Sequence, residues 1–155
     1  MMPGDAARKE FKKTRFLAIV LLALAPVVYI VIAGLLKSQG SVRVQSGGEI
    51  DMMFYILIVI ALVSPTILPL IQKAQVSNYR AGKLSKASSA QLMTTLFLIK
   101  FSMVEAIFIY GLVVFFLSGD IQRMLVFYPI GAVWSVILWP REEKMKETIE
   151  RLEAV

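Results

Sequence analysis

Glu105 and Lys100 are the residues best placed to do chemistry, because they are the only Asp, Glu, Lys or Arg side chains well inside the long apolar runs of the chain. Placing either charge at the centre of a bilayer costs about 2.5–3.5 kcal/mol on insertion scales. With only two methylenes, Glu105 cannot reach the headgroups from mid-membrane, so we expect it to be protonated or paired with a hydrogen-bond donor. The longer stem of Lys100 lets its ammonium reach toward the cytoplasmic headgroups, and an anchoring role explains this residue as well as a functional one does.

The two charges are poorly placed to neutralise each other. They are five residues apart in the sequence, which puts them about 140° apart around a helix. Glu105 therefore needs another partner, and Ser102 is the nearest polar side chain on its face of the helix by spacing. The other residues of that face are Thr94, Leu98, Phe101, Phe108, Ile109 and Leu112. The residues alone leave two roles open for Glu105: a neutral group that packs helices together by hydrogen bonding, or a site that handles protons or binds a partner.

The composition excludes several classes of function. Cys and His are absent, which excludes disulfides, thiolate nucleophiles, imidazole acid–base chemistry and most zinc sites. No pairing of a nucleophile with a base stands out for an intramembrane active site. We therefore expect no catalytic residue, no metal, no cofactor and no enzymatic activity. The formal charge of +6 is typical of basic loops beside membrane spans, so we expect no nucleic-acid partner.

Hydropathy places the chain in a membrane. Hydrophobic types make up 57% of the 155 residues and the mean hydropathy is +0.71, a combination that soluble domains do not show. A membrane-spanning helix needs about 20 apolar residues, and four runs predict an all-α transmembrane domain over residues 1–140. The spans are expected at about 16–36, 52–71, 92–117 and 124–139, the fourth being the shortest. Lys37 follows the first run directly, without a small-residue cleavage site, so we expect that run to be retained.

The distribution of Lys and Arg predicts the orientation. Basic residues cluster before the first run, between the second and third, and after the fourth: Arg8, Lys9, Lys12, Lys13, Arg15, Lys73, Arg80, Lys83, Lys86, Arg141, Lys144, Lys146 and Arg151. The other two loops carry only Lys37, Arg43 and Arg123. By the positive-inside rule both termini and the middle loop are cytoplasmic. We expect an integral protein of a bacterial or archaeal plasma membrane.

Prolines predict irregular helices in the first two runs. Pro26, Pro65 and Pro69 each remove a backbone donor and clash with the preceding turn, so we expect local kinks there. The hydroxyls of Ser64 and Thr66 are placed to bond carbonyls that the proline frees, or to face a neighbouring helix.

The connecting segments predict how the runs are joined. The middle loop, 72–91, is rich in Gln, Ser, Lys and Ala, and we expect it to extend the two flanking helices as a polar hairpin. The link at 118–120 is so short that the helices on either side must be antiparallel neighbours. The tail, 141–155, reads as a short charged amphipathic cytoplasmic helix that lies on the membrane or docks on a partner, although a solvated helix explains it equally well. Its apolar stripe consists of Met145, Ile149, Leu152 and Val155.

The stretch 101–117, FSMVEAIFIYGLVVFFL, resembles the second helix of the rotary ATPase proteolipid, subunit c of F-type ATP synthases. In that family the carboxylate that matches Glu105 picks up and releases the transported proton, and the tyrosine that matches Tyr110 lies close to the ion site. The resemblance implies those roles here. Sodium-carrying members usually have a hydroxyl residue directly after the glutamate, so Ala106 favours protons.

Two functional interpretations follow. In the first, the chain is a membrane subunit similar to the proteolipid and carries protons through reversible protonation of Glu105, with Tyr110 and Ser102 holding the proton by hydrogen bonds. In the second, it is a non-catalytic structural or assembly subunit of a larger complex, in which Glu105 bonds a partner helix. The absence of Gly from residues 52–71 favours the second, because proteolipid rings pack through a glycine-rich helix. Both interpretations predict the lipid bilayer and other membrane subunits, or copies of the same chain, as partners.

Overall fold

Helices account for nearly all of the chain that the computed structural model describes, which is residues 3–42, 44, 45, 47–81, 89–139, 141 and 143. Side chains are described from residue 11 onward, except those of residues 80, 89 and 90. No strand occurs within these described ranges. The elements in chain order are α1 (Pro3–Ile19), the π-helical segment η1 (Val20–Leu24), α2 (Ala25–Ser38), α3 (Gly48–Val63), the 3₁₀ segment η2 (Ser64–Ile67), α4 (Leu68–Arg80), α5 (Ser89–Ser118), α6 (Ile121–Leu125) and α7 (Phe127–Ile137).

Three helical segments are long and apolar enough to cross a membrane, as the first three apolar runs predict. They are Phe11–Ser38, Gly48–Tyr79 and Gln91–Ser118, and they identify the chain as an integral membrane protein. The fourth run forms a shorter apolar helix, Ile121–Ile137. At 1.5 Å per residue this last helix is about 25 Å long, and it has a one-residue interruption at Val126 between α6 and α7.

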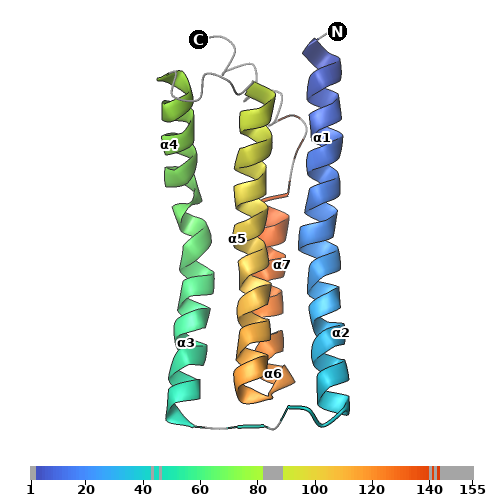
Figure 1. The fold of residues 1–155 in the computed structure, drawn as a ribbon. Helices are drawn as coiled ribbons and strands as arrows, with labels where there is room; N and C mark the ends of the chain where they lie inside the picture. Colours follow the sequence, from blue (N-terminus) through green and yellow to red (C-terminus); the bar gives the residue numbers. More distant parts are fainter. Residues whose placement is uncertain are drawn as a thin grey trace.

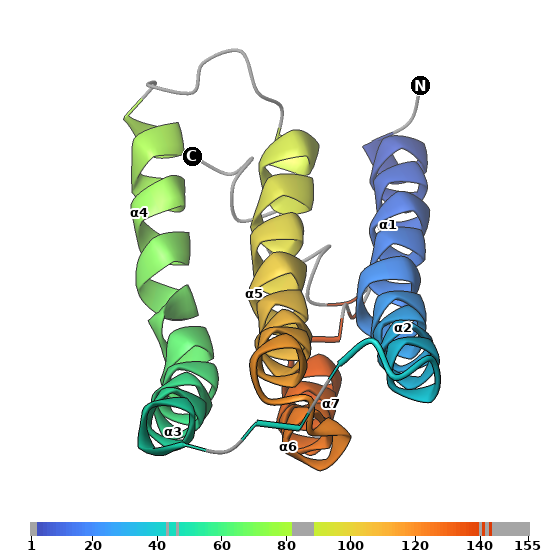
Figure 2. The ribbon, with the colours of Figure 1, turned by 60° about the horizontal axis from the view of Figure 1, so that its bottom comes forward.

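Helix α5 is the central helix of the bundle. The α1–α2 segment lies along one side of it, the α3–α4 segment lies along the other, and α7 packs on it as well (Figure 1, Figure 2). In the most apolar stretch of α5 44% of the residues are buried, against 22% and 17% in the two outer segments. The outer helices therefore present most of their apolar side chains to their surroundings, which in a membrane are lipid chains.

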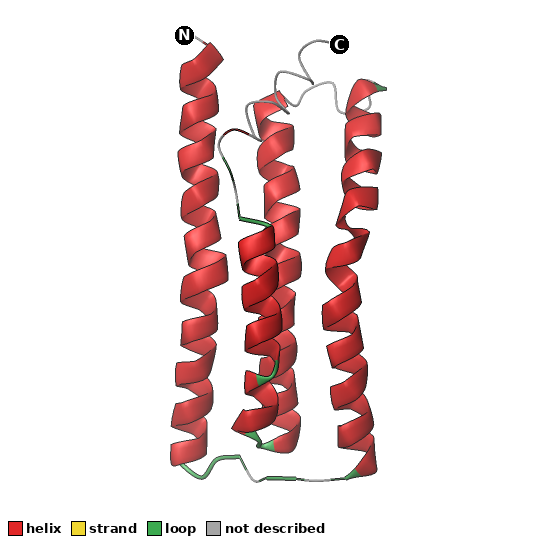
Figure 3. Ribbon diagram, turned by 180° about the vertical axis from the view of Figure 1, so that it is seen from behind, coloured by secondary structure: helices red, strands yellow, loops and turns green. Residues whose placement is uncertain are grey.

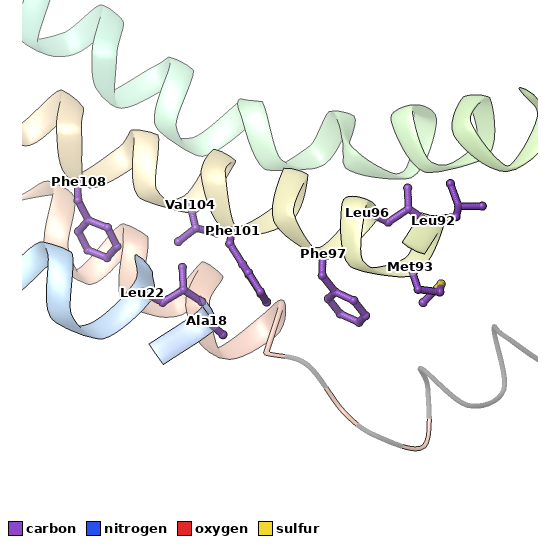
Figure 4. Packing of buried hydrophobic residues seen from close by; sticks show 9 residues of the cluster. All are labelled: Ala18, Leu22, Leu92, Met93, Leu96, Phe97, Phe101, Val104 and Phe108. Carbon is purple, nitrogen blue, oxygen red and sulfur yellow. The ribbon is translucent and has the colours of Figure 1, made fainter. Parts of the chain in front are cut away.

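The largest cluster of buried side chains joins α5 to α1 and η1 (Figure 4). Ala18 and Leu22 lie against Phe101 and Val104 near the middle of the bundle. The cluster also contains Leu92, Met93, Leu96, Phe97 and Phe108. Lipid chains are as apolar as these side chains, so close packing, rather than transfer out of water, stabilises the contact inside a membrane.

The helix irregularities occur where the prolines predict them. Pro26 follows the π-helical segment η1, and Pro65 is the second residue of the 3₁₀ segment η2. The hydroxyl of Thr66 donates a hydrogen bond to the carbonyl oxygen of Val63 at 2.6 Å. A hydroxyl beside Pro65 therefore bonds a backbone carbonyl at the break, although the carbonyl that lacks the N–H of Pro65 is that of Ala61, four residues before it.

The turn between α5 and α6 is as tight as its length predicts. Gly119 has a φ of +68°, a left-handed conformation that favours glycine, and the carboxylate of Asp120 caps α6 by accepting a hydrogen bond from the backbone N–H of Gln122 at 2.8 Å. The chain then returns antiparallel along α5. Gly131 of α7 is in close contact with the ring of Phe108 on α5, since a Cβ at Gly131 would lie 2.5 Å from that ring.

The two loops expected on the outer side lie at one end of the bundle (Figure 1). The backbone N–H of Gln45 donates to the carbonyl oxygen of Ser118 at 2.7 Å. Arg123 forms ion pairs with Asp51, at the start of α3, and with Asp120. These contacts fasten the α2–α3 connection to the α5–α6 turn.

At the opposite end, α4 continues to Arg80 and α5 begins at Ser89, so the polar segment 72–91 extends both helices as expected. The centre of that loop lies outside the described residues. The same holds for most of the tail 141–155, including its predicted apolar stripe.

Candidate functional site

Glu105 lies near the middle of α5, at the border between its buried and exposed faces. Phe101 and Phe108, one turn away on either side, are almost completely buried, with exposed fractions of 0% and 3%. Ser102 and Ile109, the neighbours on the other side, are exposed. The partly buried Glu105 carboxyl therefore contacts the bundle on one side and is open to the surroundings on the other.

The partner of Glu105 is a tyrosine on another helix. Tyr29 of α2 donates a hydrogen bond from its phenolic hydroxyl to Oε1 of Glu105 at 3.0 Å. The bond joins residues 76 positions apart in the sequence. It supplies the hydrogen-bond donor that a mid-span carboxyl requires, in agreement with the sequence-based expectation for Glu105.

The π-helical segment η1 sets which face of α2 meets α5. The buried residues of the first span-length helix are Thr14, Ala18, Leu22, Pro26 and Ala33. The first four are spaced by four residues each, which is wider than the 3.6-residue period of an α-helix. A wide turn such as η1 absorbs the difference, because it holds more residues per turn. Tyr29 then follows on the same stripe, three residues after Pro26, and reaches Glu105.

A second tyrosine supports the helix at this point. Tyr128 of α7 donates from its hydroxyl to the carbonyl oxygen of Pro26 at 2.9 Å. Its ring packs against that of Phe108, with 5.3 Å between the ring centres. The Glu105–Tyr29 pair is therefore positioned by α2, α5 and α7 together. Phe108 contributes by packing against the ring of Tyr128.

The two residues predicted to assist Glu105 lie elsewhere on α5. Ser102 is exposed. Tyr110 packs against the cluster of Ala61, Ile107, Val114 and Phe127, which joins α5 to α3 and α7. Among the described contacts, the hydrogen bond to Glu105 comes from Tyr29 and not from either predicted residue.

Sequence reasoning missed Tyr29, although a signal for it exists. It is the only side chain with a hydrogen-bonding group in the first apolar run, 16–36. A search for single polar residues in the other spans, rather than for charges alone, would have identified it as a candidate partner. Tyr128 carries no comparable signal, because its acceptor is the backbone carbonyl oxygen of Pro26, which is distant in the sequence.

The chemistry available at this site is that of a carboxyl and a phenol in an apolar setting. The pair can hold a proton and share it along a hydrogen bond, which is strong where the local dielectric is low. Within the described part of the chain there is no group of three or more His, Cys, Asp or Glu that could bind a metal ion. No known protein family, curated protein or solved structure matches the chain.

Proposed function

We propose that this chain is a membrane subunit whose four apolar helices all cross the bilayer, with both termini in the cytoplasm, and that Glu105 binds a proton reversibly. Tyr29 holds the proton in place by hydrogen bonding to the carboxyl. The geometry at Glu105 carries this proposal: a mid-span carboxyl has one phenolic partner inside the bundle and one side facing outward. A carboxyl placed in this way can exchange its proton with a neighbouring subunit or with water that reaches it.

Protonation also fits the energetics of the site. A charged carboxylate in the middle of a span is costly, whereas the neutral acid loses most of that cost and still accepts the bond from Tyr29. The resemblance of residues 101–117 to the proton-carrying helix of the proteolipid family favours the same role. In this proposal Tyr29, on a different helix, takes the place that Tyr110 has in the resemblance.

A second candidate, a structural or assembly subunit, is favoured by the same hydrogen bond. The Glu105–Tyr29 contact joins α2 to α5 within one chain, as polar residues do when they fasten helices together in a membrane. In that role Glu105 stays neutral at all times and never releases its proton.

Infrared spectroscopy during a pH titration separates the two candidates, because a protonated carboxyl and a carboxylate absorb at different frequencies. In reconstituted protein we expect, among the bands of the Asp and Glu side chains, a carboxyl band that changes with pH and that is absent from Glu105→Gln. Tyr29→Phe should shift this band, because it removes the hydrogen bond. Glu49→Gln, at an exposed position near the start of α3, is the matched control and should leave the band unchanged.

A carboxyl band that is present but does not change across the titration would refute reversible proton binding and leave the structural role. Under that structural role Glu105→Gln, which keeps a hydrogen-bonding head, should preserve assembly while Glu105→Leu weakens it. Equal assembly of both variants would contradict the structural role.

A further inference from the structure

A cavity of about 450 Å³ lies beside the proline break of the second span-length segment. Its wall comes from η2 and α4 on one side, from Lys100 of α5, and from Trp134 and the end of α7 on the other. This volume is within the range of small-ligand sites in proteins, about 300–1,000 Å³. Prolines are tolerated in membrane helices where local 3₁₀ adjustments bond the freed backbone groups again, and η2 is such a segment.

The polar groups of this cavity favour an anion. Lys100 contributes an ammonium, Gln72 an amide and Trp134 an indole N–H, all of which can donate hydrogen bonds. None of the described residues in its lining is a carboxylate. The Lys100 ammonium also lies 4.8 Å from the centre of the Phe97 ring, an arrangement that keeps the cation on the surface of α5.

A second cavity, of about 260 Å³, lies next to the first and shares Lys100. Arg141 and Trp139 are also part of its lining. Helix α7 ends at Ile137, well short of the ends of α1, α4 and α5 (Figure 3), so both cavities lie where this short helix stops. Two basic side chains and two tryptophans at a helix end are typical of a membrane interface.

The rest of the first cavity is apolar and accessible from the side. Leu68 and Leu138 contribute to its wall, while Thr66, Pro69 and Ile137 at its edge are exposed. A ligand that enters laterally would come from the bilayer and would carry an acyl chain against these residues. The cavity therefore has hydrogen-bond donors and a cation at one part of its lining and apolar side chains at the other, which suits an amphiphile with an anionic head.

We propose that these cavities bind an anionic phospholipid, with its phosphate at Lys100 and Arg141 and an acyl chain beside Trp134. The site is separate from Glu105 and does not depend on the proton-binding proposal. It assigns Lys100 a ligand, beyond a general anchoring role in the membrane.

Tryptophan fluorescence can test this lipid site directly. The chain has two Trp residues, so Trp139→Phe leaves Trp134 as the single reporter. This protein is reconstituted in phosphatidylcholine vesicles that contain acyl-brominated phosphatidylglycerol or, in parallel, acyl-brominated phosphatidylcholine, since bromine quenches tryptophan on contact. We expect the anionic lipid to associate about 25-fold more tightly, because Lys100 and Arg141 each contribute a factor of about five toward an anionic group.

Lys100 variants in the same background decide whether the preference is specific. Lys100→Gln should lower the preference about fivefold, Lys100→Arg should keep it, and Lys37→Gln, at an exposed position in the last turn of α2, should leave it unchanged. Circular dichroism and the emission spectrum in pure phosphatidylcholine check that each variant is folded. Equal quenching by both lipids, or a preference that Lys100→Gln does not lower, would overturn the proposal. Loss of the preference when soluble glycerol phosphate is added would overturn the lipid assignment, because the phosphate alone would then suffice.

Discussion

The hydrogen bond between Tyr29 and Glu105 ties the state of one side chain to the contact between two helices. Because its two ends come from α2 and α5, the bond forms only when those helices are in register. A proton on the carboxyl, or its loss, therefore changes a bond that also holds the bundle together. In the proposed function, proton binding by Glu105 and the packing of α2 against α5 are linked, so a change in one alters the free energy of the other.

Removing the Tyr29 hydroxyl should destabilise the bundle measurably. For Tyr29→Phe we expect the free energy of unfolding to fall by about 0.6–1.7 kcal/mol, which are the average and the largest value found for hydrogen bonds between helices in a membrane protein. Unfolding in mixed micelles with increasing denaturing detergent gives this quantity. A double-mutant cycle with Glu105→Ala should recover most of the loss as a coupling energy between the two side chains.

Tyr55→Phe is the matched control for this measurement. Tyr55 lies on α3 and is 65% exposed, so removal of its hydroxyl should change the free energy of unfolding by less than Tyr29→Phe does. A coupling energy near zero between Tyr29 and Glu105 would contradict the stabilising role of the bond.

At the residue scale, the sequence predicts that Glu105 needs a donor but not which residue supplies it. The need follows from local information, namely a short acidic side chain in a long apolar run. The identity of the donor depends on η1, which rotates α2 relative to a regular helix. Ser102 is predicted from its spacing and Tyr110 from the resemblance to the proteolipid, and both lie on the same helix as Glu105. The bond that Glu105 accepts comes from another helix.

The packing of α5 against α6 and α7 depends on a glycine. A Cβ at Gly111 would lie 2.9 Å from the backbone carbonyl oxygen of Met124 and 3.2 Å from Cβ of Phe127. Backbone atoms cannot move aside as the end of a flexible side chain can. This contact therefore sets how closely the two antiparallel helices approach.

Gly111→Ala should force α5 and α6 apart. We expect the free energy of unfolding to fall by about 1–3 kcal/mol, as for other overpacked contacts. Gly34→Ala is the control, because Gly34 is exposed on α2 and a Cβ there would meet nothing within 4 Å. The control should be neutral or slightly stabilising, since alanine is the better helix former. Equal losses in both variants would contradict the role of the close contact, because a Cβ at Gly34 meets nothing within 4 Å.

At the element scale, the sequence predicts most of the helices because hydropathy and proline are local signals. The three long segments, the helix breaks near Pro26 and Pro65, and the tight turn at 118–120 all follow from such signals. The interruption at Val126 and the π-helical or 3₁₀ type of each irregular turn do not follow from local signals, because packing against neighbouring helices determines them.

The arrangement of the whole molecule in the membrane can be tested by labelling, since the chain contains no native Cys. Single cysteines at Ser41, Ala81 and Glu143 would report on three exposed positions in different connections. With both termini in the cytoplasm, we expect a membrane-impermeant maleimide to label Ser41→Cys in intact cells. Ala81→Cys and Glu143→Cys should react only after the membrane is made permeable.

Glu143 is the position that tests the fourth crossing. If Glu143→Cys reacts in intact cells while Ala81→Cys does not, the helix Ile121–Ile137 fails to cross and the four-span proposal is wrong. Reversed labelling of all three positions would instead contradict the positive-inside orientation.

The short length of the α6–α7 helix has a consequence for the lipid around the protein. The hydrocarbon core of a typical bilayer is about 30 Å thick, whereas this helix is about 25 Å long. A span that is too short draws the two leaflets toward each other, at a modest free-energy cost for each ångström of hydrophobic mismatch. The longer α1–α2 and α3–α4 segments on the other sides impose no such thinning. In the four-span arrangement proposed above, the protein deforms its membrane asymmetrically, and bilayers made from lipids with shorter acyl chains should accommodate it best.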